Sequence, residues 1–290
     1  MSTTTPPLVL SIQSHVAWGH VGNAAAVFPL QRLGFEVLPI HTVQFSNHTG
    51  YGQFRGQVFG AEHIREVLLG LRERGMLARL SAVLSGYLGD ADTGRVILEA
   101  VGEIRQHNPG VRYLCDPVMG DVGRGVFVSP AIPDFLRDQA IPFANIITPN
   151  QFEFELLTGS KPANVPEMLR VARQLRGRGP DTVVITSVAT PDIPEGSLGT
   201  LAVNGEGAWL VMTPHLTLHP LPNGMGDVFS ATLLGRLLAG CSLPKALELA
   251  TATLYALVER TAAGARDLPL VAEQEHIVQP GQAFVAQALV

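Results

Sequence analysis

The chain has 290 residues, of which 46% are hydrophobic and 16% are charged, and its formal net charge is -5. This length and composition are typical of a globular chain that buries a large core without metals or disulfide bonds. The negative charge and the lack of a lysine- or arginine-rich tract argue against a nucleic-acid partner. Neither a basic, apolar leader nor a run of 18 apolar residues is present, so we expect a cytoplasmic protein without a membrane span.

Strand-like and helix-like segments alternate along the chain. After a flexible tail at residues 1–7, we expect a single domain over residues 8–290. Short apolar runs predict strands at Leu8–Gln13, Glu36–Val43, Ala82–Tyr87, Arg112–Asp116, Asn145–Ile147 and Thr182–Ser187. Longer patterned runs predict helices at Gly22–Leu33, Ala61–Arg74, Asp92–His107, Gln151–Thr158 and Val165–Arg178. The alternation predicts an α/β fold, with a mainly parallel central sheet and helices on both faces.

The C-terminal third departs from this alternation. Thr200–Asn204 and Ala208–Met212 are separated by Gly-Glu-Gly, which predicts a short antiparallel hairpin. Three helices are expected beyond it, at Asp227–Ala239, at Leu243–Arg260 and, with a weaker pattern, at Leu268–Val278. The hairpin and these helices complete the expected domain.

Several polar segments fall where the predicted strands end. Ser14 follows the first strand, Thr42–Tyr51 lies at the end of the second, and Asp116 closes the fourth. Asn150 and Glu153 follow the fifth. Because ligands of open α/β sheets collect beyond the carboxyl ends of the strands, these segments predict a binding cleft along one edge of the sheet.

The most informative segment is Gly-Met-Gly-Asp at residues 224–227, which leads directly into an amphipathic helix. Glycine lacks a Cβ, so this turn is able to aim the amides of Gly224, Met225 and Gly226 at a bulky anion. Asp227 then supplies a carboxylate that can accept a proton from a hydroxyl. The pattern favours phosphoryl transfer to an alcohol with Asp227 as general base, and the alternative is an ordinary helix cap by Asp227.

The Gly-Met-Gly-Asp segment resembles the signature of the ribokinase-like small-molecule kinases, and four further segments are similar to those of the pyridoxal kinases. These segments are Ile12–Asn23, Thr42–Tyr51, Leu114–Asp121 and Ile147–Glu153. The resemblance runs in order from about Leu8 to about Arg260. It implies the ribokinase-like fold, a homodimer, and transfer of the γ-phosphate of ATP to the 5′-hydroxyl of pyridoxal in vitamin B6 salvage.

The resemblance also implies a nucleotide and metal site on one side of the cleft. Asn150 and Glu153, whose spacing also suits a helix capping box, would organise a divalent cation beside the phosphates. Asp116 and Thr148 would lie by the phosphates and by a monovalent cation if K⁺ is required, with Asp121 closer to Mg²⁺. The expected metal ligands are Asp116, Asp121, Thr148 and Glu153. The expected ATP contacts are Asp116, Thr148, Asn150, Glu153, Thr186, Ser187 and Gly226.

Two departures from related kinases concern this side of the cleft. Thr186 and Ser187 stand near the position where some bacterial relatives carry a lysine, so the phosphates would meet neutral hydroxyls. The loop Asp121–Val128 is interpreted as a flap over the site, with an ordinary surface loop as the alternative. Val126 and Phe127 occupy the region where some bacterial pyridoxal kinases hold a cysteine thought to trap the substrate aldehyde. Nucleotide affinity and covalent capture of pyridoxal therefore stay open.

On the substrate side, the resemblance implies that Ser14 holds the pyridine nitrogen or hydroxyl, although a plain turn residue is the alternative. His15 and His48 are interpreted as structural hydrogen-bonding groups rather than as acids or bases. Small-molecule pockets combine apolar walls with a few placed polar groups. The expected substrate contacts are Ser14, Val21, Val43, Phe45, Thr49, Gly50 and Asp227.

Two other functions stay open at this point. A hydroxymethylpyrimidine kinase shares the fold and also phosphorylates a hydroxymethyl group on a nitrogen ring, but the segment Thr42–Tyr51 favours pyridoxal. A protein that binds B6 vitamers without turnover would not need the intact Gly-Met-Gly-Asp turn. The sequence does not rank pyridoxal, pyridoxine and pyridoxamine, which differ in one ring substituent.

Overall fold

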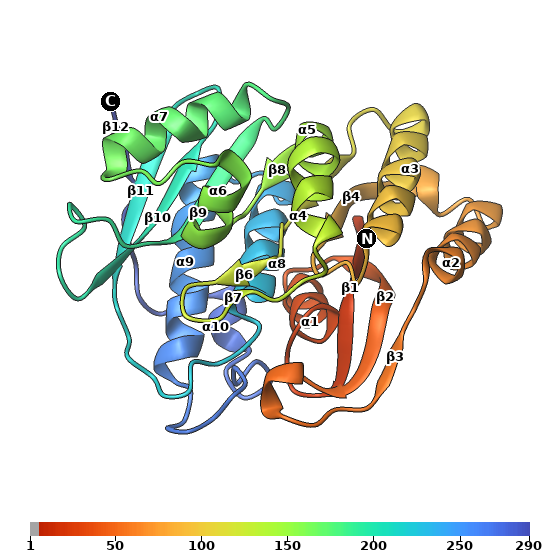
Figure 1. Cartoon of the computed structure of the whole chain (residues 1–290), viewed down its shortest axis with the longest axis horizontal. Coiled ribbons are helices and arrows are strands. Elements are labelled where there is room, and N and C mark those ends of the chain that lie inside the picture. Colours follow the sequence, from red (N-terminus) through yellow and green to blue (C-terminus); the bar gives the residue numbers. More distant parts are fainter. Residues whose placement is uncertain (1–5) are drawn as a thin grey trace, which may run out of the picture.

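A computed structural model describes residues 6–290, so residues 1–5 of the predicted flexible tail lie outside the described part. Its centre is a ten-stranded sheet in the order β12-β11-β10-β9-β8-β5-β4-β1-β2-β3 (Figure 1). The strands from β9 to β2 in this order are parallel, and at the two edges β10, β11, β12 and β3 each pair antiparallel with the neighbouring strand. The predicted α/β fold, its mainly parallel sheet and the antiparallel hairpin are therefore confirmed.

The strands of this sheet are β1 (Leu8–Trp18), β2 (Glu36–Asn47), β3 (Gly56–Val58), β4 (Leu80–Ser85), β5 (Arg112–Cys115), β8 (Ile146–Ile147), β9 (Thr182–Val188), β10 (Ser197–Val203), β11 (Ala208–Pro214) and β12 (Gln287–Leu289). A separate two-stranded ribbon consists of β6 (Gly120–Asp121) and β7 (Gly125–Val126). The helices are α1 (Asn23–Arg32), α2 (Ala61–Glu73), α3 (Ala91–His107), α4 (Ala131–Phe135), α5 (Ile141–Phe143), α6 (Gln151–Thr158), α7 (Val165–Arg176), α8 (Met225–Leu238), α9 (Leu243–Glu259) and α10 (Glu275–Val278).

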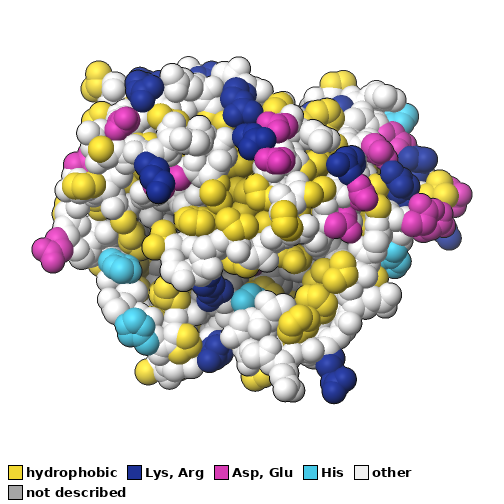
Figure 2. Space-filling model, in the orientation of Figure 1, with side chains coloured by type: hydrophobic (Ala, Val, Ile, Leu, Met, Phe, Trp, Pro, Cys, Tyr) yellow, Lys and Arg dark blue, Asp and Glu magenta, His cyan; other side chains and the backbone are white. Residues whose placement is uncertain are grey.

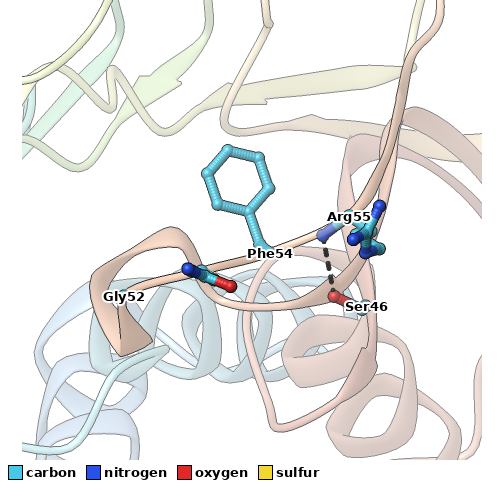
Figure 3. A pocket seen from close by; sticks show the side chains of 5 residues that line it. Ser46, Gly52, Phe54 and Arg55 are labelled. Carbon is cyan, nitrogen blue, oxygen red and sulfur yellow. Dashed lines mark hydrogen bonds between the residues drawn. The ribbon is translucent and has the colours of Figure 1, made fainter.

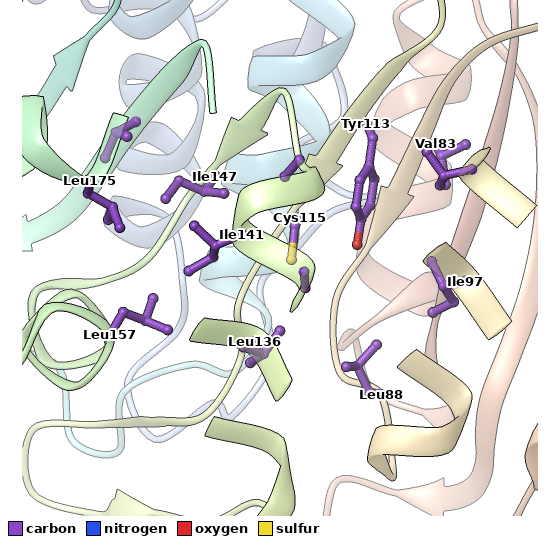
Figure 4. Close-up of a cluster of buried hydrophobic side chains, with 14 of the residues drawn as sticks. Val83, Leu88, Ile97, Tyr113, Cys115, Leu136, Ile141, Ile147, Leu157 and Leu175 are labelled. Carbon is purple, nitrogen blue, oxygen red and sulfur yellow. The ribbon is translucent and has the colours of Figure 1, made fainter. Parts of the chain in front are cut away.

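Helices cover both faces of the sheet because side chains alternate between the faces along each strand. In β1, Leu10 and Ile12 join the core beneath α2 to α7, whereas Val9 joins the core beneath α1 and α8. Figure 4 shows part of the larger core, with Tyr113 and Cys115 of β5 in the same cluster as residues of the covering helices. No helix in the described part of the chain is long and apolar enough to cross a membrane.

The first two strands are longer than predicted. β1 continues to Trp18 rather than ending at Gln13, and β2 continues to Asn47 rather than ending at Val43. A register shift between Gln13 and His15 lets the two strands resume pairing beyond the irregularity. Ser14 therefore lies inside a strand and not in a loop after it, which corrects the prediction.

The predicted helix at Leu268–Val278 is wrong except for its last turn, α10. Leu268 and Leu270 are both buried on either side of Pro269, which has no amide to donate to a helix. The segment therefore starts as an extended stretch followed by turns.

The chain between Ala131 and Phe143 contains helical structure that the sequence pattern did not predict. Here α4 runs directly into a π-helical turn at Leu136–Ala140 and then into α5. Pro133 and Pro142 interrupt the helical pattern in the sequence, but the short segments tolerate them near their starts. A further 3₁₀ turn, η1, follows β2 at Thr49–Tyr51.

Candidate active site

The Gly-Met-Gly-Asp segment forms the turn that begins α8. Gly224 has a φ of 79°, and a Cβ at this position would lie only 2.0 Å from the carbonyl oxygen of His20. Only glycine suits this conformation and this close contact. The first intrahelical bond runs from the amide of Val228 to the oxygen of Gly224, at 3.0 Å. The amides of Met225, Gly226 and Asp227 precede it, so they have no helical carbonyl to bond and present donors at the positive end of the helix dipole.

Asp227 lies in the first turn of α8, directly behind these amides. Its Oδ2 accepts a hydrogen bond of 2.9 Å from the amide of Gly22, just before α1. Burial raises the pKa of the Asp227 carboxyl, and the Gly22 amide opposes that shift by stabilising the charged form. Gly22 is also packed against Ser14, because a Cβ on Gly22 would collide with the Ser14 oxygen atoms. Ser14 and Asp227 thus both contact the same glycine.

Asp116 lies at the end of β5 and is buried, with 4% of its surface exposed. Its Oδ2 accepts a hydrogen bond of 3.1 Å from the Ser230 hydroxyl, which also lies 2.8 Å from the Thr148 hydroxyl. Burial raises the pKa of Asp116 well above its ordinary value, and the charges of Glu153 and Asp227 add to this effect. A Cβ on Gly226 would lie 3.7 Å from Asp116 Oδ2, so this carboxylate faces the turn that begins α8.

Asn150 and Glu153 form the capping box of α6. Asn150 Oδ1 accepts from the amide of Glu153, and Glu153 Oε2 accepts from the amide of Asn150, both at 2.9 Å. Glu153 Oε1 accepts from the amide of Met119 at 2.9 Å, and Asn150 Nδ2 donates to the oxygen of Gly120 at 2.9 Å. Burial raises the pKa of Glu153 to about 7, against the opposing effect of the backbone amides. The pair therefore holds the base of the β6–β7 ribbon as well as capping the helix.

Thr186 and Ser187 lie beside this box at the end of β9. The amide of Thr186 donates to the oxygen of Pro149 at 3.0 Å, and Thr186 forms a parallel bridge with Asn150. Ser187 is exposed and has a φ of 56°. Such backbone strain in a non-glycine residue often accompanies a functional site.

The predicted metal ligands are only partly brought together. Asp116 and Thr148 share the hydroxyl of Ser230, whereas Asp121 lies in the β6–β7 ribbon, 3.7 Å from Arg124 Nε. Within residues 6–290, no three His, Cys, Asp or Glu side chains are arranged to hold a metal ion by themselves. Two nearby buried carboxylates, Asp116 and Glu153, have no Lys, Arg or His ion-pair partner in this part of the chain. Both oxygens of Glu153 already accept backbone hydrogen bonds, so Asp116 is the member of this pair better placed to hold a divalent cation that takes its other oxygen ligands from elsewhere.

The predicted substrate contacts line the ends of β1 and β2 and the turn that follows. Val21 and Val43 are buried, Phe45 is half-buried, and Thr49 and Gly50 are exposed in η1. The ring of Phe45 lies 4.8 Å from that of Phe54. Figure 2 shows a hollow across this face of the molecule, with hydrophobic side chains gathered above it.

An open pocket of about 540 Å³ lies on this side of the molecule. It is lined by Ser46, Gly52, Gln53, Phe54 and Arg55, and Figure 3 shows the ring of Phe54 projecting away from the backbone. Asp227 is not among the lining residues. The pocket thus belongs to the β2–β3 connection beside the predicted substrate contacts, not to the turn before α8.

His15 and His48, which were interpreted as structural, both make hydrogen bonds within the fold. His48 Nδ1 accepts from the amide of Gly50 at 3.1 Å and so caps η1. His15 Nδ1 lies 3.0 Å from Gln44 Oε1, and its ring stacks on that of His41 at 4.3 Å between centroids. Burial lowers the pKa of both His15 and His48, which favours the neutral rings that these contacts need.

Sequence reasoning missed two residues that the structure places in this site. Ser230 donates a hydrogen bond to Asp116, and the sequence signal for it was a small polar residue one turn after Asp227 in a largely apolar helix. The amide of Gly22 donates to Asp227. Gly22 lies in the segment Ile12–Asn23 that resembles the pyridoxal kinases, but no role was assigned to it from the sequence. Neither pairing is local in sequence, so no spacing rule identifies it.

Comparisons with known proteins match the chain to pyridoxal kinases and to a family model of phosphomethylpyrimidine kinases. A family model described as phosphomethylpyrimidine kinase matches residues 77–270. The pyridoxal kinase PdxY of Deinococcus radiodurans is 51% identical over 295 residues, covering 99% of each chain. The pyridoxal kinase PdxY of Rubrobacter xylanophilus is 52% identical, covering 95% of each chain. Among solved structures, the pyridoxal kinase of Leishmania donovani in complex with ADP and pyridoxamine superimposes with a TM-score of 0.90 at 29% identity, covering 98% of this chain and 99% of that one.

Proposed function

The chain belongs to the pyridoxal kinase family within the ribokinase-like superfamily, and from this we infer that it transfers the γ-phosphate of ATP to the 5′-hydroxyl of pyridoxal. The product, pyridoxal 5′-phosphate, would serve vitamin B6 salvage. One observation carries the mechanism: the half-buried carboxylate of Asp227 lies in the first turn of α8, next to the backbone amides that begin this helix.

In the proposed reaction, Asp227 accepts the proton of the 5′-hydroxyl while that oxygen attacks the γ-phosphate. A hydroxyl is a poor nucleophile until its proton has an acceptor within hydrogen-bond reach. The Gly22 amide holds the carboxylate in one orientation at 2.9 Å. The amides of the Gly224–Gly226 turn would bind the transferring phosphoryl group, whose negative charge the helix dipole stabilises.

We propose that Asp116 and Asp121 hold Mg²⁺ together with phosphate oxygens, since Mg²⁺ is usually bound by one or two carboxylates and by the nucleotide. The hydroxyl of Thr148 would be held in place by its contact with the Ser230 hydroxyl, which also bonds Asp116. Both oxygens of Glu153 accept backbone hydrogen bonds, so this residue would act by holding the ribbon that carries Asp121. Bound Mg²⁺ neutralises the charge that develops on the phosphates.

The proposed nucleotide contacts are Asp116, Thr148, Asn150, Glu153, Thr186, Ser187 and Gly226. The bridge between Thr186 and Asn150 supports this grouping because it joins the end of β9 to the start of α6. The proposed vitamer contacts are Ser14, Val21, Val43, Phe45, Thr49, Gly50 and Asp227. Ser14 and Asp227 both contact Gly22, which supports a ring and a hydroxyl bound near each other.

The test is ADP release by the purified protein with Mg-ATP and, in parallel, pyridoxal, pyridoxine, pyridoxamine and hydroxymethylpyrimidine. We expect turnover with pyridoxal and a loss of about 100- to 10,000-fold in Asp227→Ala, the usual contribution of a general base. ATP binding, measured by calorimetry, should survive in this variant. Near-normal turnover by Asp227→Ala would remove Asp227 from the mechanism.

A second candidate is hydroxymethylpyrimidine kinase, because the family model that matches residues 77–270 carries the description phosphomethylpyrimidine kinase. Turnover on hydroxymethylpyrimidine alone would support the same mechanism but assign the enzyme to a different pathway. Stoichiometric vitamer binding without ADP release would instead indicate a binding protein.

We also propose that the enzyme works as a cytoplasmic homodimer. Light scattering on the purified protein tests the oligomeric state, and a monomeric mass would contradict the proposed homodimer. Replacing K⁺ by Na⁺ in the ADP-release assay tests whether a monovalent cation takes part.

A further inference from the structure

Asp267 lies in the loop between α9 and α10 and has no role in the function proposed above. It is 216 residues away in sequence from one of its partners and 247 from the other. Its Oδ2 accepts a hydrogen bond of 2.5 Å from the Tyr51 hydroxyl, and its Oδ1 accepts one of 2.8 Å from the amide of His20. One carboxylate therefore joins two segments that are otherwise held by different strands.

The Tyr51 bond acts on the turn that carries two proposed vitamer contacts, Thr49 and Gly50. Tyr51 closes this turn, η1, whose N-cap is His48. The neighbouring Arg266 strengthens the link, because its Nη1 donates to the oxygen of Gly50 at 3.1 Å. The same guanidinium lies 5.4 Å from the centre of the Tyr51 ring, within the range of a cation–π contact.

The His20 bond acts on the segment that holds the proposed base. The oxygen of His20 packs against Gly224, the glycine that begins the anion-binding turn. Two residues later, the amide of Gly22 donates to Asp227. His20 Nδ1 also lies 2.9 Å from the oxygen of Leu268, so the loop holds this segment at two points. Displacement of His20 would therefore move both the turn and the donor to Asp227.

The same loop contacts the anion-binding turn from its other end. The amide of Asn223 donates to the oxygen of Arg266 at 2.8 Å, and Asn223 forms a parallel bridge with Asp267. Asn223 directly precedes Gly224. The loop thus touches the segments on both sides of the proposed reaction centre, and Asp267 is the charged group at the contact.

We propose that Asp267 is a positioning residue that fixes the vitamer-binding turn relative to the general base, through Tyr51 on one side and His20 on the other. The role in turnover rests on the proposed function, whereas the role in holding the two segments does not. Hydrogen bonds to a charged acceptor are stronger than those between neutral groups, so the carboxylate suits this task better than an amide.

The test compares Asp267→Ala, Asp267→Asn and Tyr51→Phe in steady-state assays with pyridoxal and ATP varied separately. Tyr51→Phe removes only the vitamer-side bond, so KM for pyridoxal should rise about fivefold while kcat stays within about twofold. Asp267→Ala removes both bonds, so KM for pyridoxal should rise and kcat should fall, each by about tenfold. KM for ATP should stay within about twofold in all three. The changes in KM and kcat of Asp267→Asn should lie between those of Tyr51→Phe and Asp267→Ala. In the double variant of Asp267→Asn with Tyr51→Phe, the two effects should be less than additive.

Asp192 offers a matched control. Its carboxylate also accepts from one hydroxyl, that of Thr190 at 2.6 Å, and from one backbone amide, that of Val165 at 2.9 Å, but it contacts none of the proposed site residues. Asp192→Asn should leave both kinetic constants unchanged. Equal kinetic losses in this control, or a KM for ATP that rises with that for pyridoxal, would overturn the proposal.

Hydrogen–deuterium exchange provides a readout that does not depend on turnover. In Asp267→Ala, peptides covering residues 19–22 and 48–51 should exchange faster than in the wild type, and the peptide covering residues 150–153 should not. If Asp267→Ala does not fold, Asp267→Asn takes its place. Unchanged exchange at both segments would overturn the proposal even if pyridoxal proved not to be the substrate. A wild type without turnover on pyridoxal would instead overturn the proposed function.

Discussion

The phosphate side and the vitamer side of the candidate site are built in different ways. The phosphate side rests on the starts of two helices, α6 and α8, and on buried carboxylates at strand ends. The vitamer side rests on the far ends of β1 and β2, on the short turn η1 and on exposed loops. The phosphate side has long-range contacts of its own, from Gly22 to Asp227 and from Ser230 to Asp116, but its amides belong to the helix starts themselves. On the vitamer side, even the turn η1 is held by a long-range contact, that of Tyr51 with Asp267. Damage to the first should therefore lower kcat, and damage to the second should mainly raise KM for the vitamer.

Apart from loss of the proposed base, the largest expected effect is that of Gly224→Ala on the phosphate side. A Cβ at this position would meet the oxygen of His20, so the turn must shift and misplace its amides. Loss of such donors costs about 100-fold or more in kcat. The control is Gly240→Ala, where φ is 89° but nothing lies within 4 Å of the added atom. If kcat of Gly224→Ala stays within a few-fold of the wild type, the turn is not the anion site.

A second prediction separates activity from stability on the phosphate side. Burial raises the pKa of Asp227, so at pH values between the unfolded and the folded pKa the folded protein holds a proton that the unfolded chain has released. Stability therefore falls as pH rises through this window, and above it the charged, buried group destabilises the fold. Asp227→Asn lacks this penalty, so its melting temperature at neutral pH should rise by a few degrees while turnover is lost. The kcat of the wild type should rise with pH through the same raised pKa.

The control for this prediction is Asp192, whose pKa is shifted in the opposite direction. Burial is the largest single influence on the pKa of Asp192 and raises it, but the hydrogen bonds from Thr190 and from the amides of Val165 and Asp192 together lower it overall. Its contribution is present above the unfolded pKa and is lost as pH falls, so Asp192→Asn should melt lower at neutral pH. A lower melting temperature for Asp227→Asn as well would show that the Gly22 bond outweighs the cost of burial.

The vitamer side is tested by Phe54→Ala. The Phe54 ring packs on Phe45 and lines the open pocket, so its loss removes apolar contact area beside the proposed ring site. We expect KM for pyridoxal to rise about fivefold with kcat within about twofold, measured by steady-state kinetics. The control is Val58→Ala, which truncates a comparably exposed apolar side chain on β3 that does not line the pocket, and it should change neither constant. A fall in kcat alone would place Phe54 with the phosphate side instead.

The smallest expected effect is that of Ser187→Gly. Glycine adopts a φ of 56° without strain, so the melting curve should show a gain of about 0.5 to 1 kcal/mol. Loss of the hydroxyl should raise KM for ATP about threefold, which Ser187→Ala should match without the gain in stability. A variant that gains stability with an unchanged KM for ATP would separate the strain from nucleotide binding.

Sequence reasoning predicted the main strands, most of the helices and the capping box of α6 because each depends on residues close together in the chain. The Asn150–Glu153 spacing and the glycines before α8 are local signals of this kind. The extension of β1 past Gln13 could not be predicted, since it depends on renewed pairing with β2. The partners of Asp267 lie more than 200 residues away, so no local pattern identifies them.

The register shift in β1 divides the strand into a half that is constrained by the core and a half that leads toward the site. Before it, Leu10 and Ile12 are fully buried and are constrained by the volume of the core. After it, the strand pairs in a new register and carries half-exposed residues toward the site. Because a strand normally ties every residue to one alternating pattern, the bulge frees the second half from the first. The distal half of β1 can therefore diverge with the preferred vitamer while the proximal half keeps the fold.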